Sequence, residues 1–417
     1  MSHSSNDDLP ACAPTTSAVR AGIGTDSQFG AVVAPLHLST NFTFDGYGGK
    51  RQYDYTRSGN PTRDVLADAL AELEHGAASV VTATGMAAVA LALELVPPGG
   101  TIVATHDCYG GTWRLLNRNA ERGRWQVIFA DLTDAEALSA ALAQRPALVW
   151  VETPSNPLLR VTDIAEVARA ARAVGALTVV DNTFLSPLLQ QPLELGADVV
   201  VHSTTKYING HSDVVGGAVI ARDCAVHEEL SWWANCIGLT GAPFDSYLTL
   251  RGLRTLAPRM RAHQENTSAV ADLLESHPAV RAVYWPGLAS HPGHQLAKRQ
   301  QQGFGAMVSF ELGGEGESAV EGVRALLSQL RYFSLAESLG GVESLIAHPA
   351  SMTHAAMTPQ ARRTAGIADS LLRLSVGIEA SQDLCADLAA GLDRALPYTL
   401  AVDNSGTAGE KVVTVTG

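Results

Sequence analysis

Cysteine is scarce in this chain, and its spacing excludes two common uses of the residue. The 417 residues include five cysteines, with no C-x-x-C pair among them. Zinc sites and the disulfide frameworks of small secreted domains both need clustered or evenly paired cysteines. We therefore expect neither, and a reducing cytoplasm is the compartment that fits. The cysteines are Cys12, Cys108, Cys224, Cys236 and Cys385.

Long apolar runs and an excess of basic residues are also missing. No run approaches the ~18 apolar residues that a membrane span requires, and the N-terminal stretch lacks the apolar core of a signal peptide. Lysine and arginine total 29 against 42 aspartate and glutamate residues, a formal net charge of −13. Such a chain has no basic stripe for a phosphate backbone, so we expect neither a membrane nor a nucleic acid as partner.

Two further sequence patterns are absent. The 13 histidines form neither H-E-x-x-H nor another metal-ligand spacing, so we predict no metal site. No G-x-G-x-x-G follows an early apolar run, which argues against a dinucleotide-binding oxidoreductase. That class, together with a cofactor-free binding protein, is the alternative to the enzyme described below.

Length and composition indicate a globular protein of two domains. Hydrophobic residues make up 46% of the chain and charged residues 17%, and the length exceeds that of one ordinary core. We expect an arm over 1–60 and a large α/β domain over 61–255. A smaller α+β domain is expected over 256–399, and a flexible tail over 400–417.

Seven short apolar runs alternate with helical patterns in the large domain. Strands that are apolar on both faces and separated by helices predict a mostly parallel sheet flanked by helices, an α/β fold. The smaller domain has fewer and more alternating strands, expected over 281–285, 306–312 and 371–377. The runs of the large domain cover 78–83, 101–106, 126–131, 147–152, 177–181, 199–203 and 216–221.

Two polar residues follow strands of this predicted sheet, where ligands of parallel sheets collect. Asp181 ends the run "LTVVD", and Lys206 follows "VVVHSTT". A lysine near an apolar interior has a lowered pKa and can form an imine with an aldehyde. A carboxylate can keep a pyridine nitrogen protonated. The pair therefore predicts pyridoxal phosphate, although Lys206 reaching solvent and Asp181 capping a helix would give the same pattern.

The phosphate of that cofactor needs hydrogen-bond donors. Gly85 and Met86 open a helical pattern, so their backbone amides would face an anion, and Ser203 and Thr205 flank the lysine. Tyr109 follows another strand, where an aromatic ring can stack on the cofactor and its hydroxyl can move a proton. An ordinary turn and a core tyrosine are the alternatives that these residues leave open.

The segment "YDYTRSGNPTR" carries tyrosine and arginine outside the predicted core. Tyr55 and Arg57 precede the first helix of the large domain, where they could not easily fold back into their own subunit's site. Tyrosine and arginine are enriched at protein interfaces, so the arm is predicted to contact another subunit. A solvated basic loop is the alternative.

Nine stretches of the chain together indicate a family. They resemble, in order and spacing, the cysteine and methionine metabolism family of pyridoxal-phosphate enzymes over roughly residues 17 to 396. This resemblance implies the aspartate aminotransferase-like fold, which is PLP-dependent transferase fold type I. The stretches are "DYTRSGNPTRD", "TGM", "HDCYGGTWR", "ETPSNPLLRVTDI", "VVDNTFLSP", "HSTTKYINGHSDVVGG", "FDSYLTLRGLRTL", "AESLGGVESLIAHPASMTH" and "LLRLSVGIE".

The resemblance also implies a role for each matching cofactor residue. Lys206 matches the imine-forming lysine, Asp181 the partner of the pyridine nitrogen, and Tyr109 the ring-stacking residue. Tyr55 and Arg57 match a pair that reaches the phosphate of the neighbouring subunit, so a homotetramer built as a dimer of dimers is expected. The implied phosphate donors of the same subunit are Gly85, Met86, Ser203 and Thr205.

For the amino-acid substrates, the resemblance implies a carboxylate clamp and a distal pocket. Arg373 matches the arginine that binds the substrate α-carboxylate bidentately, helped by Asn156 and Ser338. The residues that would set the distal pocket are Arg114 and Glu337. Asp54, which stands where many γ-lyases have glutamate, is a further expected substrate-binding residue.

Members of the family differ in the bond that they break. β-Lyases tend to carry tryptophan where Leu339 stands, and methionine γ-lyases cysteine where Gly111 stands, so neither activity is expected. The implied reaction is γ-replacement, joining O-succinylhomoserine or O-acetylhomoserine to cysteine to give cystathionine. The alternative within the family is γ-elimination of cystathionine to cysteine, 2-oxobutyrate and ammonia.

Overall fold

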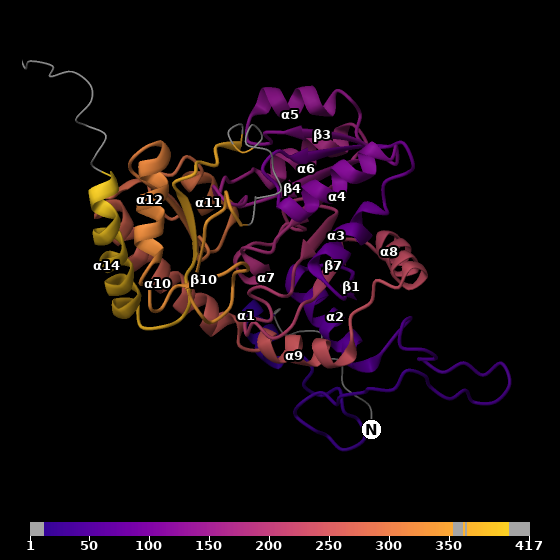
Figure 1. The fold of residues 1–417 in the computed structure, drawn as a ribbon. Coiled ribbons are helices and arrows are strands. Elements are labelled where there is room, and N and C mark those ends of the chain that lie inside the picture. Colours follow the sequence, from indigo (N-terminus) through magenta and orange to yellow (C-terminus); the bar gives the residue numbers. More distant parts are fainter. Residues whose placement is uncertain (1–11, 353–361, 363–364, 400–417) are drawn as a thin grey trace, which may run out of the picture.

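The computed structural model describes residues 12–352, 362 and 365–399, which form two β-sheets. The larger has seven strands in the order β1-β7-β6-β5-β4-β2-β3, and the smaller has five in the order β10-β11-β12-β9-β8. Figure 1 shows the smaller sheet and its helices, in orange and yellow, beside the larger α/β part. The predicted tail at 400–417 lies outside the described residues. The domain limits near 60, 255 and 399 stay a prediction.

Every one of the seven predicted apolar runs forms a strand of the larger sheet. The pairs β2-β3, β2-β4, β4-β5 and β5-β6 are parallel, whereas β7 runs antiparallel to β1 and β6. The expected mostly parallel sheet is confirmed, and β1, β2, β4, β5 and β6 end at one edge. The strands are β1 (Ala78–Thr82), β2 (Thr101–Thr105), β3 (Gln126–Ala130), β4 (Leu148–Glu152), β5 (Leu177–Asp181), β6 (Val199–His202) and β7 (Gly217–Ala221).

This sheet is apolar on both faces because helices cover both. Along β4, Leu148 and Trp150 belong to one core cluster, and Val149 and Val151 belong to another. The second of these clusters draws on helices α2 (Pro61–Glu74), α5 (Ala135–Leu142), α6 (Ile164–Ala173) and α9 (Pro243–Leu253). The first draws on α3 (Gly85–Leu93), α4 (Gly110–Glu121) and α8 (Cys224–Ile237).

The smaller sheet is built around β12, which runs antiparallel to both of its neighbours, β9 and β11. The strands expected over 281–285, 306–312 and 371–377 are present, and the sequence pattern missed the two short ones, β10 and β11. The strands are β8 (Val280–Tyr284), β9 (Met307–Leu312), β10 (Ser334–Leu335), β11 (Leu345–Ala347) and β12 (Leu371–Ser375). The helices of this part are α10 (Leu256–Ser276), α11 (His294–Gln300), α12 (Gly316–Leu327) and α14 (Ser381–Thr399).

An arm without long regular elements connects α1 (Pro14–Arg20) to α2 and extends away from both sheets (Figure 1). It exposes large apolar side chains, among them Phe29 at 83% exposure, Val32 and Leu38. Among the described residues, no helix combines the length and apolar character needed to cross a membrane. All five cysteines are free thiols.

The start of α2 offers a test of the packing between arm and sheet. Asn60 is fully buried, accepts hydrogen bonds from the backbone of Thr62 and Arg63, and donates to the His37 carbonyl. Asn60→Ala removes the helix cap and leaves buried groups unpaired, so we expect the free energy of unfolding to fall by about 1–3 kcal/mol. The measurement is unfolding in urea. The variant should have a lower midpoint concentration, while the slope of the unfolding free energy against urea concentration stays unchanged.

A matched variant gives the control for this prediction. Asp134 caps the exposed start of α5 and accepts only from the Ala137 backbone in the structure. Asp134→Ala should therefore cost no more than about 1 kcal/mol. An equal loss of unfolding free energy in both variants would show that the burial of Asn60 contributes nothing to stability.

Candidate active site

Asp181 and Lys206 lie on the loops that follow two adjacent parallel strands. Asp181 is the last residue of β5 and pairs with Val201 of β6, and Lys206 stands four residues beyond the end of β6. The two loops are tied together, because the Ser203 backbone N–H donates to the Thr183 hydroxyl at 2.9 Å. The structure therefore brings these residues to one sheet edge, as the sequence pattern predicts.

The environment of Asp181 suits a cationic partner from outside the protein. Its carboxylate accepts from the Thr183 backbone N–H at 3.0 Å, and no ion pair to it forms within the described parts of the chain. Burial raises the pKa of Asp181, against the hydrogen bonds of Thr183 and the charge of His202. A buried carboxylate without a cation is costly, so a protonated ring nitrogen placed beside it would be stabilised.

Lys206 has the properties of a nucleophilic amine. Its Nζ donates to the Ser338 hydroxyl at 2.8 Å. The pKa of Lys206 is lowered to about 8, first by burial and then by the positive charge of Arg373, while the charge of Glu337 acts in the opposite direction. A substantial fraction of the amine is therefore neutral near physiological pH, as attack on an aldehyde requires.

The smaller sheet contributes the third part of the site. Arg373, in the middle of β12, is 2% exposed. Its Nη1 donates to Asn156 Oδ1 and its Nη2 to the Ser338 carbonyl, both at 2.9 Å. Burial lowers the pKa of Arg373 to about 10. Arg373, Asn156, Ser338 and Lys206 thus form one connected group between the two sheets.

The start of α3 lies against the loop that precedes Lys206. A Cβ on Gly85 would come 2.7 Å from the side chain of Ser203, so only glycine fits there. The Thr84 hydroxyl caps this helix by accepting from the Ala87 backbone, and the amides of Gly85 and Met86 stand at its N-terminus, where anions are favoured. The Thr205 hydroxyl is bonded to the backbone of Gly216.

Tyr109 stands directly before α4 and is held by a buried carboxylate. Its backbone N–H donates to Glu152 Oε2 at 2.7 Å, while its side chain is 42% exposed. A Cβ on Gly111 would lie 2.6 Å from the Tyr109 ring and 2.8 Å from Met86 Sδ. The ring therefore lies over the starts of α3 and α4, at the same edge as Lys206.

Glu152 is a site residue that the sequence reasoning missed. It ends β4 and pairs in register with Asp181 of β5. Burial raises the pKa of Glu152 well above its usual range, and the nearby charge of Asp181 raises it too. A charged residue ending an apolar run was the signal for Asp181, and the same signal in "ALVWVE" would have identified Glu152.

A buried arginine also fixes the turn after Lys206. Arg259, on α10, donates from Nη1 to the Tyr207 carbonyl at 2.7 Å and from Nη2 to the carbonyls of Gly252 and Ile208 at 2.8 and 3.2 Å. Burial lowers its pKa to about 10. The main chain directly after Lys206 is thereby attached to α10.

Three of the predicted residues lie in the arm, apart from this group. Arg57 donates to Asn235 of α8 at 3.0 Å, and its guanidinium lies 5.5 Å from the centre of the Tyr55 ring. Asp54 pairs with Lys50 at 3.1 Å, and this contact is the main reason that its pKa falls to about 2. No hydrogen bond or ion pair joins the three to the Lys206 group among the residues described.

The two predicted residues of the distal pocket are both exposed. Arg114 is on α4, one turn beyond Tyr109. Glu337 adjoins Ser338, and its charge acts on both Lys206 and Arg373. The charge of Glu337 therefore acts on the site, whereas no hydrogen bond or ion pair joins Arg114 to the group within the described residues.

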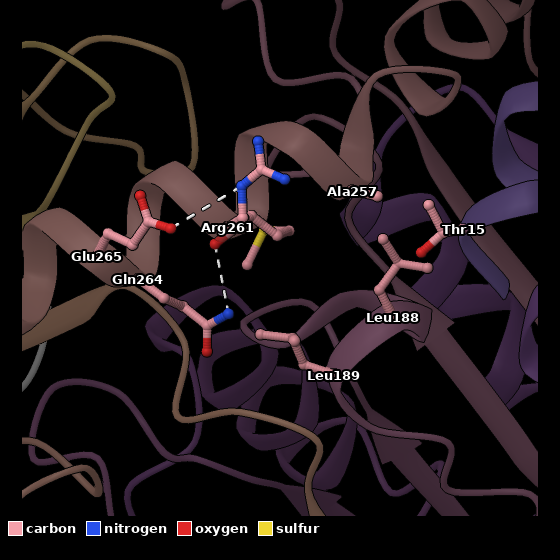
Figure 2. A pocket seen from close by; sticks show the side chains of 8 residues that line it. Thr15, Leu188, Leu189, Ala257, Arg261, Gln264 and Glu265 are labelled. Carbon is pink, nitrogen blue, oxygen red and sulfur yellow. Dashed lines mark hydrogen bonds and ion pairs between the residues drawn. The ribbon is translucent and has the colours of Figure 1, made fainter. Parts of the chain in front are cut away.

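A separate depression of about 460 Å³ lies between α1, α7 (Ser186–Leu189) and α10. Figure 2 shows its lining, with Arg261 and Glu265 on α10 and Leu188 and Leu189 on the facing segment. It contains none of the predicted site residues. No cluster of residues that could hold a metal ion occurs in the described parts of the chain.

Comparison with known proteins assigns the chain to a family. The profile of the "Cys/Met metabolism PLP-dependent enzyme" family matches residues 15–393. The chain belongs to this family. Its cofactor is therefore pyridoxal 5'-phosphate, as the Asp181–Lys206 pattern predicted, and its fold is the expected fold type I.

Similar proteins cover nearly all of the chain. The cystathionine γ-synthase of Escherichia coli strain K12 is 57% identical over 377 residues, which are 90% of this chain and 97% of that protein. The crystal structure of cystathionine γ-synthase from Xanthomonas oryzae pv. oryzae in complex with cystathionine is 66% identical, with a TM-score of 0.91, and covers 93% of this chain and 100% of that one. The cystathionine γ-lyase of Lactobacillus plantarum is 41% identical, with a TM-score of 0.88, over 92% and 100%.

The lowered pKa of Lys206 predicts a pH dependence for cofactor binding. Since the neutral amine is the form that attacks, the rate at which the apoprotein captures pyridoxal phosphate should rise about fivefold from pH 7 to pH 8 and level off above pH 9. Stopped-flow visible absorbance measures this rate. In Arg373→Met the midpoint should move to higher pH, because a positive charge near the amine is lost. A profile that keeps rising toward pH 10 in the unmodified protein would contradict the lowered pKa.

Proposed function

We propose that the protein joins an acylated homoserine, O-succinylhomoserine or O-acetylhomoserine, to L-cysteine by γ-replacement and releases L-cystathionine. The observation that carries this proposal is the 57% identity to a cystathionine γ-synthase along nearly the full length of both chains. The related crystal structure in complex with cystathionine supports the same product. The reaction belongs to methionine and transsulfuration metabolism, and the free cysteines suit a cytoplasmic location.

Lys206 is proposed to carry the protons. When bound, pyridoxal phosphate supplies an electron sink for charge that develops on the substrate carbons. Lys206 would take a proton from Cα and, after giving it up, take one from Cβ. The Cγ–O bond would then break with release of succinate or acetate, the thiol of cysteine would lose its proton and add at Cγ, and Cβ and Cα would regain their protons. Asp181 would keep the ring nitrogen protonated, and Tyr109 would stack on the ring and shuttle protons at Cγ and the incoming thiol.

Arg373 is proposed to bind the α-carboxylate of the amino-acid substrate. Its guanidinium is oriented by Asn156 and by the Ser338 carbonyl, and such a preset fork suits a carboxylate. The Ser338 hydroxyl, which accepts from Lys206, places this carboxylate next to the base. The distal pocket is assigned to Arg114 and Glu337, and Asp54 is proposed as a further substrate-binding residue.

The phosphate of the cofactor is assigned to both subunits of a dimer. Gly85 and Met86 at the start of α3, with the hydroxyls of Ser203 and Thr205, bind it from one side. We propose that Tyr55 and Arg57 reach it from the neighbouring subunit, and that two such dimers form a tetramer. The exposed apolar residues of the arm and the 60% exposed Trp232 on α8 support contact with other copies.

γ-Elimination of cystathionine is the second candidate, favoured by the γ-lyase relative at 41% identity. The methionine γ-lyase reaction remains disfavoured because Gly111 stands where cysteine is usual. The β-lyase reaction remains disfavoured because Leu339 stands where tryptophan is usual.

The proposed reaction can be tested by product identification. Purified protein is incubated with O-succinylhomoserine with and without cysteine, and separately with cystathionine. We expect cystathionine to form only when cysteine is present, faster than oxobutyrate forms from cystathionine. Oxobutyrate released from cystathionine well above the rate of coupling would assign the γ-lyase reaction instead.

The role of Lys206 is tested by removing its amine. Lys206→Ala should lower kcat by on the order of 10²–10⁴-fold, the contribution of a positioned acid–base group, while the fold is kept. Borohydride reduction of the unmodified holoprotein should attach the pyridoxyl group of the cofactor covalently to Lys206. The exposed Lys298 on α11 gives a matched control, and Lys298→Ala should leave kcat unchanged. Near-normal turnover in Lys206→Ala would refute the assignment.

A further inference from the structure

One fully buried carboxylate bridges the two loops that carry the cofactor-binding residues. Glu74, the last residue of α2, has no exposed surface. Its Oε1 accepts from Asn182 Nδ2 at 2.8 Å and contacts His202 Nε2 at 2.5 Å. Asn182 directly follows Asp181, and His202 ends β6, just before Ser203. One oxygen atom therefore contacts both loops.

The place of Glu74 is unfavourable for an unpartnered carboxyl group. Glu74 stands at the C-terminal end of a helix, where the helix dipole disfavours a negative charge, and it is removed from water. A carboxylate in such a place is costly unless it is paired and hydrogen-bonded. His202, which is also fully buried, is the basic side chain that contacts it within the described residues.

The loop after β5 is held from its other side as well. Asn182 donates to the Gln190 carbonyl at 2.7 Å and accepts from Gln190 Nε2 at 3.0 Å. It is therefore fixed between Glu74 and Gln190, and the residue before it, Asp181, has its backbone fixed in consequence. The His202 charge also acts on Asp181, where it favours the ionised carboxylate.

We propose that the buried, hydrogen-bonded pair of Glu74 and His202 positions the loops of Asp181 and Lys206 and thereby sets the affinity for pyridoxal phosphate. Both are positioning residues, since neither is assigned a contact with the cofactor. The proposal rests on the roles given above to Asp181 and Lys206. It goes beyond them because it makes the affinity for the cofactor depend on two residues, Glu74 and His202, that lie behind the cofactor-binding loops.

The pair is tested with three variants: His202→Gln, Glu74→Gln and the double variant. Glutamine at position 202 removes the imidazole that contacts Glu74 Oε1, so the buried Glu74 side chain loses this partner. We expect His202→Gln to raise the dissociation constant for pyridoxal phosphate by about tenfold or more, corresponding to one factor of ten per 1.4 kcal/mol. In the double variant the buried carboxyl group is removed as well, so at least half of this increase in the dissociation constant, on a logarithmic scale, should be reversed.

The measurement is a titration of each apoprotein with pyridoxal phosphate, followed by visible absorbance, together with the thermal midpoint of each apoprotein. Glu74→Gln alone keeps the acceptor for Asn182, so we expect a smaller loss of affinity than in His202→Gln. Affinity in His202→Gln equal to that of the unmodified protein would overturn the proposal. A double variant that binds no better than His202→Gln would overturn the pairing.

A neighbouring pair provides the control. His75 and Glu194 form the same type of contact one residue further along the chain, but both side chains are about half exposed. His75→Gln should leave the affinity for the cofactor unchanged, because exposed pairs contribute little. The titration uses no amino-acid substrate, so it stands even if the γ-replacement assignment fails. If the unmodified apoprotein bound no pyridoxal phosphate, the roles of Asp181 and Lys206 themselves would fall.

Discussion

The hydrogen bond from Lys206 to Ser338 joins two sheets that share no strand. Lys206 belongs to the loop after β6, and Ser338 belongs to the segment between β10 and β11. Arg373 reinforces the junction by binding Asn156 on one side and Ser338 on the other. Every group assigned to the substrate α-carboxylate therefore lies on this junction. Its geometry depends on how the two sheets are held against each other.

Buried charge is the second constraint on the site. Asp181 and Glu152 end adjacent strands as neighbouring carboxyl groups, while Lys206 and Arg373 place two basic groups close together. Each arrangement costs free energy in the protein alone. A ligand with a cationic ring at one end and a substrate carboxylate at the other offsets both costs. Desolvation by burial is the first cause of the shifted pKa values of all four groups, and a neighbouring like charge adds to it at Glu152 and Lys206.

Much of the larger sheet could be predicted because its signal is local. Runs that are apolar on both faces became strands, and the parallel pairing brought Asp181 and Lys206 to one edge. Arg373 had no such signal, since a single arginine in "LLRLSVG" looks like any strand residue, and its role followed only from the family resemblance. Glu74 and His202 lie 128 residues apart in sequence, and only the tertiary structure brings them into contact. Strands β10 and β11 are too short to show a period.

The fork of Arg259 has a consequence for how Lys206 moves. Because its guanidinium holds the carbonyls of Tyr207 and Ile208, the main chain at the lysine moves with α10, a helix of 21 residues that also packs on β8 and β9. The amine can then move over a few ångströms by rotation about its own side-chain bonds. The proton transfers proposed for Lys206 would therefore need only torsion in one side chain, with no rearrangement of the loop.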